Sequence, residues 1–158
     1  MRLGLVVAFA VLVLDQASKA LLIGWLAARG DAPVELTGFL RLVMVWNRGV
    51  SFGLFNAPES AELQRWVLAA VALAVAGALV VWLRRVKQRW LALSLGAIVG
   101  GALGNAIDRI ARGAVADFFD VHVAGWHWPA FNVADSAITL GVVALLADGL
   151  LRSRRGAT

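Results

Sequence analysis

The stretch Phe131-Asn132-Val133-Ala134-Asp135-Ser136 places a carboxylate about one helical turn inside the last apolar segment of the chain. Moving an ionised Asp into the hydrocarbon of a membrane costs several kcal/mol, about 2.5–3.5 on insertion scales. A carboxylate at such a position is therefore paired, faces water or takes part in chemistry. Its partners must come from other polar residues that reach the same depth.

The composition indicates an integral membrane protein. Of the 158 residues, 61% are hydrophobic and 16% are charged, whereas soluble domains are near half apolar and a quarter charged. The mean hydropathy is +0.79. We expect a single membrane-embedded domain over residues 1–158, with four segments long enough to span. These segments cover about 3–28, 63–83, 90–110 and 131–151.

The basic residues orient the four segments. The net charge is +5, but the bases gather at the ends of the apolar segments, so they indicate topology rather than a nucleic-acid partner. The positive-inside rule then predicts cytoplasmic termini and outer connections at about 29–62 and 111–130. The chain contains no Cys, which excludes disulfides, thiolate metal sites and thiol nucleophiles.

The residue pattern of the first outer connection predicts a small β-sheet. Val34–Leu36 and Leu40–Trp46 have the pattern of short strands, with Gly38 and Gly49 as breaks. We expect an amphipathic sheet over about 33–56, lying on the outer membrane surface. The predicted fold class is an all-α integral membrane protein with four transmembrane helices and a small extracytoplasmic β-sheet.

With this orientation, most buried polar groups gather in one layer near the outer face. Asp15 and Lys19 are four residues apart and are expected to form a structural pair on one helix face. Asp108 and Arg109 point in different directions and are expected to bond to neighbouring loops. The remaining members of the layer are Asn105, Asp117, Asn132 and Asp135. Small residues in the third segment (Gly96, Gly100, Gly101 and Gly104) favour close helix packing.

Two carboxylates brought together would suit peptide hydrolysis. Asp135 and a second Asp would share one proton, because like charges a few ångströms apart do not both ionise cheaply. The ionised member takes a proton from water, and the protonated member donates one to a peptide carbonyl. From the residues alone, the second Asp could be Asp15, Asp108 or Asp117, although the apolar surroundings of Asp117 are unusual for a solvated acid.

Three other functions use the same residues. A proton-coupled carrier would also place carboxylates within a membrane, although four spans without a repeat are poor carrier architecture. In a non-catalytic scaffold, the acids would only pair with Arg109 or Lys19. A metal site could combine His122 and His127 with Asp117 and Asp120, but no HExxH spacing is present.

Five blocks of sequence, in order and together covering nearly the whole chain, resemble those of the bacterial lipoprotein signal peptidases (signal peptidase II). They are Val13-Leu14-Asp15-Gln16-Ala17-Ser18-Lys19, Asn47-Arg48-Gly49-Val50-Ser51-Phe52-Gly53, Gly101-Ala102-Leu103-Gly104-Asn105-Ala106-Ile107-Asp108-Arg109, Val115-Ala116-Asp117-Phe118 and Phe131-Asn132-Val133-Ala134-Asp135-Ser136. Val50-Ser51, where many members carry alanines, departs mildly from the pattern.

The resemblance implies an aspartic endopeptidase of the bacterial cytoplasmic membrane, active near the outer face. Such an enzyme removes the signal peptide of prolipoproteins on the N-terminal side of a diacylglyceryl-modified Cys. The resemblance assigns catalysis to Asp117 and Asp135 and implies no metal or other cofactor. The expected partners are prolipoproteins and membrane lipid, and the expected state is a monomer. The implied supporting residues are Asp15, Lys19, Asn47, Gly49, Asn105, Asp108, Arg109, Asn132 and Ala134.

Overall fold

Four long helices make up most of the chain. The structure, a computed structural model, describes residues 1–49 and 58–155. The helices are α1 (Arg2–Ala27), α2 (Pro58–Leu83), α3 (Arg89–Arg112) and α4 (Val133–Arg155). Each contains a segment that is long and apolar enough to cross a membrane. Many large apolar side chains on α1, α2 and α4 are exposed, as lipid-facing residues would be.

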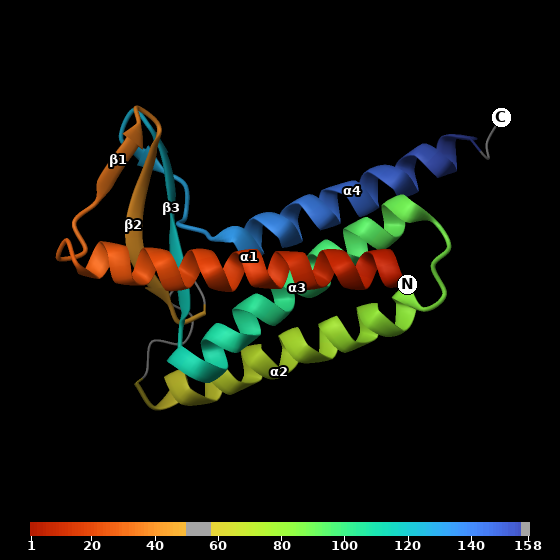
Figure 1. The fold of residues 1–158 in the computed structure, drawn as a ribbon, viewed down its shortest axis with the longest axis horizontal. Coiled ribbons are helices and arrows are strands. Elements are labelled where there is room, and N and C mark those ends of the chain that lie inside the picture. Colours follow the sequence, from red (N-terminus) through yellow and green to blue (C-terminus); the bar gives the residue numbers. More distant parts are fainter. Residues whose placement is uncertain (50–57, 156–158) are drawn as a thin grey trace.

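Helix α3 is the centre of the bundle. In its most apolar window 67% of the residues are buried, against 17% in each of the other three helices. Figure 1 shows α3 running between α2 and α4 with α1 across it. Because most of α3 is covered by other helices, it can carry polar groups that must be kept out of hydrocarbon.

Small residues on α3 allow its neighbours to approach closely. A Cβ atom added to Gly96 would meet the backbone of Gly4 on α1, and one added to Gly101 would meet the carbonyl oxygen of Ala134 on α4. The expected role of the glycines in close packing is therefore confirmed. Gly101 matters most for the site, since Ala134 immediately precedes Asp135.

A four-stranded antiparallel sheet stands at one end of the bundle, opposite the N-terminus of α1 and the far end of α4 (Figure 1). Its strands are β1 (Val34–Thr37), β2 (Leu40–Asn47), β3 (Val115–Val123) and β4 (Trp126–His127), in that spatial order. Four apolar helices with a small sheet confirm the predicted fold class.

Only part of the sheet was predicted. The strands expected at Val34–Leu36 and Leu40–Trp46 are present as β1 and β2, and residues 50–56 of the expected sheet lie outside the described residues. The other half, β3 and β4, comes from the second outer connection, which was not expected to form strands. In β3, apolar and acidic side chains occur on both faces, and the first four residues are all buried, so the strand lacks a clean alternation.

Two sets of contacts fix the sheet to the helices. Leu26 at the end of α1, Leu42 on β2 and Phe118 on β3 form a buried apolar cluster. Phe131, just before α4, pairs with Phe119 as an isolated antiparallel bridge. The start of α4 is therefore held against the middle of β3.

Candidate active site

Asn132 and Asp135 form a reciprocal cap at the start of α4. The Asn132 Oδ1 accepts a hydrogen bond from the backbone N–H of Asp135 at 3.0 Å, and an Asp135 carboxylate oxygen accepts one from the backbone N–H of Asn132 at 3.2 Å. This is a capping box with Asp in the place of the usual Glu. The cap fixes the Asp135 side chain at the helix N-terminus, where the helix dipole favours negative charge.

The bridge at Phe131 brings Asp117 to this cap. The backbone N–H groups of Phe118 and Phe119 both donate to the Phe131 carbonyl, at 3.1 and 2.9 Å, and Phe131 N–H donates to Phe119 at 3.0 Å. Because Asn132 follows Phe131 directly, its side chain reaches Asp117 on β3. The Asn132 Nδ2 donates to Asp117 Oδ1 at 2.7 Å.

Two asparagine amides link the two carboxylates. The Asn105 Nδ2, from α3, donates to Asp135 Oδ1 at 2.7 Å. The Asn105 Oδ1 lies 3.3 Å from the Asn132 Nδ2, which also serves Asp117. The result is a chain from Asp135 through Asn105 and Asn132 to Asp117. Each amide is oriented by a contact at its other end, so the chain needs no movement to hold both acids.

Asn47 contacts Asp117 from the end of β2. Its Nδ2 donates to Asp117 Oδ2 at 3.0 Å, while its Oδ1 accepts from the backbone N–H of Gly49 at 2.9 Å. Gly49 has a φ of +130°, a backbone conformation that favours glycine. The turn after β2 therefore fixes the Asn47 amide with its donor toward Asp117.

Burial and charge together make Asp117 a weak acid. Asp117 is 1% exposed, and its pKa is raised from 3.8 to about 6. Burial is the largest cause and the nearby charge of Asp135 acts in the same direction, while hydrogen bonds from the two asparagines act in the opposite direction. A carboxyl group with this pKa can exist in both protonation states near neutral pH, as a shared-proton pair requires.

Lys19 is the centre of a second cluster, which contacts the first through Asn105. Its Nζ lies 2.9 Å from Asp15 and 2.8 Å from Asp108, and all three side chains are 0% exposed. The predicted pair of Asp15 with Lys19 is therefore present. Asp108 accepts a hydrogen bond from the backbone N–H of Ala116, in the second outer connection, at 3.2 Å, as expected. Its ion pairs, however, are with helix residues, which was not expected.

The Lys19 cluster supports the site through two contacts. Lys19 Nζ donates to Asn105 Oδ1 at 3.1 Å, which leaves the Asn105 Nδ2 to face Asp135. Asp15 Oδ1 accepts from the backbone N–H of Ala134 at 3.0 Å. Through these contacts α1 positions both the amide beside Asp135 and the first turn of α4.

Sequence reasoning missed two members of the Lys19 cluster, Gln16 and Arg112. Gln16 Nε2 lies within 3.2 Å of Asp15, Asp108 and the Gly104 carbonyl, and Arg112 forms an ion pair with Asp108. The sequence contains an indication of each, because Gln16 is a polar residue within a span and Arg112 lies one helical turn after Asp108.

Arg109 borders the carboxylates without forming an ion pair among the residues that the structure describes. Its Nη1 donates to the Asn105 carbonyl at 3.3 Å, and its Nε is buried with no hydrogen-bond partner. A buried unpartnered donor is costly. It is therefore available to a ligand that enters beside Asp117 and Asp135.

The histidines lie in a different cluster, at the far end of the sheet. His127 Nδ1 is 3.0 Å from the Asp120 carboxylate, whose other partner is Arg41 at 2.6 Å. His122 pairs with Glu35 at 3.1 Å. Within residues 1–49 and 58–155, no three His, Asp or Glu side chains are arranged to hold a metal ion. His127 and Asp120 of the alternative metal set are in contact, but His122, His127, Asp117 and Asp120 do not together form such a site.

The chain is similar to the members of one protein family. The model of the family described as signal peptidase (SPase) II matches residues 7–151. A lipoprotein signal peptidase of Methylobacterium sp. (strain 4-46) is 53% identical over 156 residues, covering 98% of this chain and 92% of the relative. One from Methylorubrum extorquens (strain PA1) is 52% identical over 153 residues, covering 94% and 86%.

Two solved structures share the fold. Both are described as bacterial membrane enzymes studied by the in meso method. The first has a TM-score of 0.77 and 25% sequence identity, and the match covers 98% of this chain and 91% of the other. The second has a TM-score of 0.75 and 26% identity, with coverage of 93% and 92%.

Proposed function

This chain belongs to the signal peptidase II family, and on that premise we propose that Asp117 and Asp135 are the aspartic dyad of a lipoprotein signal peptidase. The enzyme cuts prolipoproteins immediately before the diacylglyceryl-modified Cys. The observation that carries the proposal is the chain of amides, Asn105 and Asn132, that joins these two carboxylates.

In the proposed reaction the dyad holds one proton between its two carboxyl groups. The ionised carboxylate removes a proton from water as the water oxygen bonds to the peptide carbonyl carbon. The protonated carboxyl gives its proton to the carbonyl oxygen, which forms a neutral tetrahedral intermediate. The C–N bond then breaks as the proton taken from water passes to the leaving nitrogen of the Cys. One hydroxyl of the intermediate returns its proton to the other carboxylate, which restores a dyad with one proton. No covalent enzyme intermediate forms.

The position of the dyad suits a substrate held in lipid. Asp117 and Asp135 lie at the sheet end of the bundle, where three apolar helices, α1, α3 and α4, meet the strands. We place this end at the outer face of the bacterial inner membrane and both termini in the cytoplasm. A signal helix lying in the bilayer would then present its scissile bond at the depth of the dyad. Arg109 and Asn47 are the groups available to hold its extended backbone.

The test is cleavage of a synthetic diacylglyceryl prolipoprotein peptide by purified variants. Asp117→Asn and Asp135→Asn should each lose cleavage by at least about 100-fold, the usual effect of removing a general acid or base. Asp120→Asn is the matched control, since Asp120 is also a buried acid on β3 but binds Arg41 and His127. Unchanged cleavage by either dyad variant would refute the assignment.

Two further measurements separate the alternative functions. Cleavage that is lost in EDTA and restored by a divalent metal would point to the histidine cluster instead of the dyad. Gradient-dependent uptake into proteoliposomes, with no proteolysis, would indicate a carrier. We expect neither result, and we expect the double Asp117→Asn, Asp135→Asn variant to remain folded and inactive.

A further inference from the structure

A cavity on the other side of β2 from the dyad is lined by three arginines. Its volume is about 470 Å³, which is within the range of small-molecule sites, about 300–1,000 Å³. The lining residues are Trp46, Arg48, Ala61, Glu62, Arg65, Arg112, Gly113 and Ala114. We propose that this cavity binds the phosphate of an anionic phospholipid headgroup.

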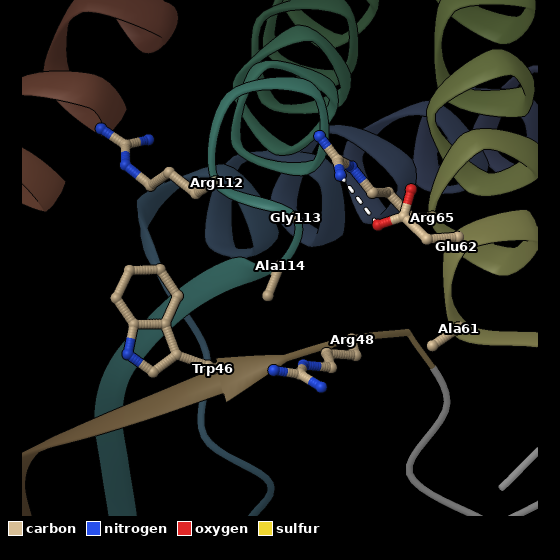
Figure 2. A pocket seen from close by; sticks show the side chains of 8 residues that line it. All are labelled: Trp46, Arg48, Ala61, Glu62, Arg65, Arg112, Gly113 and Ala114. Atoms are coloured by element: carbon tan, nitrogen blue, oxygen red, sulfur yellow. Dashed lines mark hydrogen bonds and ion pairs between the residues drawn. The ribbon is translucent and has the colours of Figure 1, made fainter. Parts of the chain in front are cut away.

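Arg48 supplies the free positive charge. It has no hydrogen bond or ion pair with any described residue. Figure 2 shows its guanidinium lying beneath Ala114, while Arg112 leans away from the cavity. Arg112 is already paired with Asp108. An incoming phosphate would therefore meet a guanidinium that no described side chain neutralises, the group best suited to bind its oxygens in pairs.

The opposite wall, formed by α2, carries one cation and one anion that pair with each other. Arg65 pairs with Glu62 at 3.0 Å and donates to the carbonyls of Arg109 and Ile110 at 2.6 and 2.8 Å. These bonds satisfy the exposed carbonyls at the C-terminal end of α3, which would otherwise repel an anion. Ala61 and Glu62 belong to the first turns of α2, whose N-terminal dipole attracts one.

The depth of the cavity selects a membrane lipid rather than a dissolved ion. The apolar span of α2 begins at Ala61 and the helix α3 ends at Arg112, and both residues line the cavity. The cavity therefore lies where two spans emerge from hydrocarbon, at the level of lipid phosphates. Trp46, which lines the cavity, is 44% exposed, as is usual for aromatic residues at the membrane interface.

The cavity is separate from the dyad because neighbouring residues on a strand point to opposite faces. Asn47 contacts Asp117 on one face of β2, whereas Trp46 lines the cavity on the other. Lipid binding can therefore be measured without cleavage, and its outcome does not depend on the proposed reaction.

The test is native mass spectrometry of the full chain in neutral detergent with equimolar phosphatidylglycerol and phosphatidylcholine. We expect the wild type to retain phosphatidylglycerol preferentially and Arg48→Gln to bind it about fivefold more weakly. Arg29→Gln is the matched control. Arg29 is exposed like Arg48, but it follows the end of α1 and does not line the cavity. It should keep the wild-type preference, and Arg48→Lys should bind more tightly than Arg48→Gln.

Three results would overturn the proposal. Equal retention of the two lipids by the wild type would mean that no anionic headgroup is selected. An equal loss in Arg48→Gln and Arg29→Gln would mean that general surface charge attracts the lipid. Displacement of phosphatidylglycerol by millimolar inorganic phosphate or glycerol 3-phosphate would make the cavity a site for free anions. Persistence of the bound lipid against both competitors supports the lipid assignment.

Discussion

At the scale of the residue, the pKa of Asp117 makes stability depend on pH. Burial raises this pKa from 3.8 to about 6. The protonated Asp117 side chain therefore stabilises the fold fully below about pH 4, and this stabilisation is lost as the pH rises through about 6. The loss is at most about 3 kcal/mol. Asp117→Asn cannot ionise. We therefore expect its Tm in detergent, relative to wild type, to increase between about pH 4 and about pH 8.

The stability contributed by Asp120, on the same strand, should depend on pH in the opposite direction. Although burial raises its pKa, hydrogen bonds from His127 and Arg41 outweigh burial, and the net pKa is lowered. Its contribution is therefore lost as the pH falls, and Asp120→Asn should lose Tm relative to wild type as the pH rises. If the Tm of both variants relative to wild type changed in the same direction with pH, the raised pKa of Asp117 would be contradicted.

Lys19 is a second residue whose setting predicts a large effect. It is fully buried between Asp15 and Asp108, and removing one member of a buried ion pair costs about 3–5 kcal/mol. Lys19→Met should therefore lower the Tm sharply or prevent accumulation of folded protein. Lys87→Met, at an exposed lysine of the α2–α3 connection, should change the Tm little. Equal effects would mean that the buried cluster contributes little to stability.

At the scale of the element, Asn132 has two functions that substitution can separate. It caps α4 through its Oδ1 and binds Asp117 through its Nδ2. Asn132→Ser keeps a capping oxygen but cannot reach Asp117 in the same way, whereas Asn132→Ala loses both. We expect the alanine variant to be about 1 kcal/mol less stable than the serine variant, and both to cleave poorly. Full cleavage by Asn132→Ser would show that the contact with Asp117 is dispensable.

The elements differ in how far the sequence predicts them. Hydropathy finds the four helices because a span needs about 20 apolar residues whatever surrounds it. Strand β2 is also recognisable from its composition. Strand β3 is not, since Asp117 and Phe118 are adjacent and both buried, which breaks the alternation of a half-exposed strand. Its two faces are buried by different partners, Asn47 and Asn132 on one and Leu26 on the other, and neither is local in sequence.

At the scale of the whole molecule, the placement of cations supports the proposed choice of Asp117 among the acids that the residues alone left open. Asp15 and Asp108 are both paired with Lys19, whereas Asp117 and Asp135 are held by neutral amides. An acid neutralised by a buried lysine is poorly suited to proton transfer, while one held by amides can exchange a proton. Sequence spacing predicts the pair of Asp15 with Lys19, but it cannot show that Asp108 on α3 reaches the same lysine.

The packing of α4 on α3 should control the position of Asp135. A Cβ atom added to Gly101 would lie 2.5 Å from the Ala134 carbonyl oxygen and 2.8 Å from Ile138, so Gly101→Ala must push the start of α4 away. Overpacking of this kind costs about 1–3 kcal/mol, and a displacement of about 1 Å can slow a reaction about 100-fold. We therefore expect a lowered Tm together with a larger loss of cleavage.

The matched control for Gly101→Ala is Gly77→Ala on α2, where an added Cβ meets nothing within 4 Å. Because alanine is the better helix former by about 1 kcal/mol, this variant should keep full cleavage with an equal or higher Tm. If Gly101→Ala lowered the Tm but cleaved at the wild-type rate, the dyad would tolerate movement of α4. The close contact of Gly101 with Ala134 would then serve stability alone.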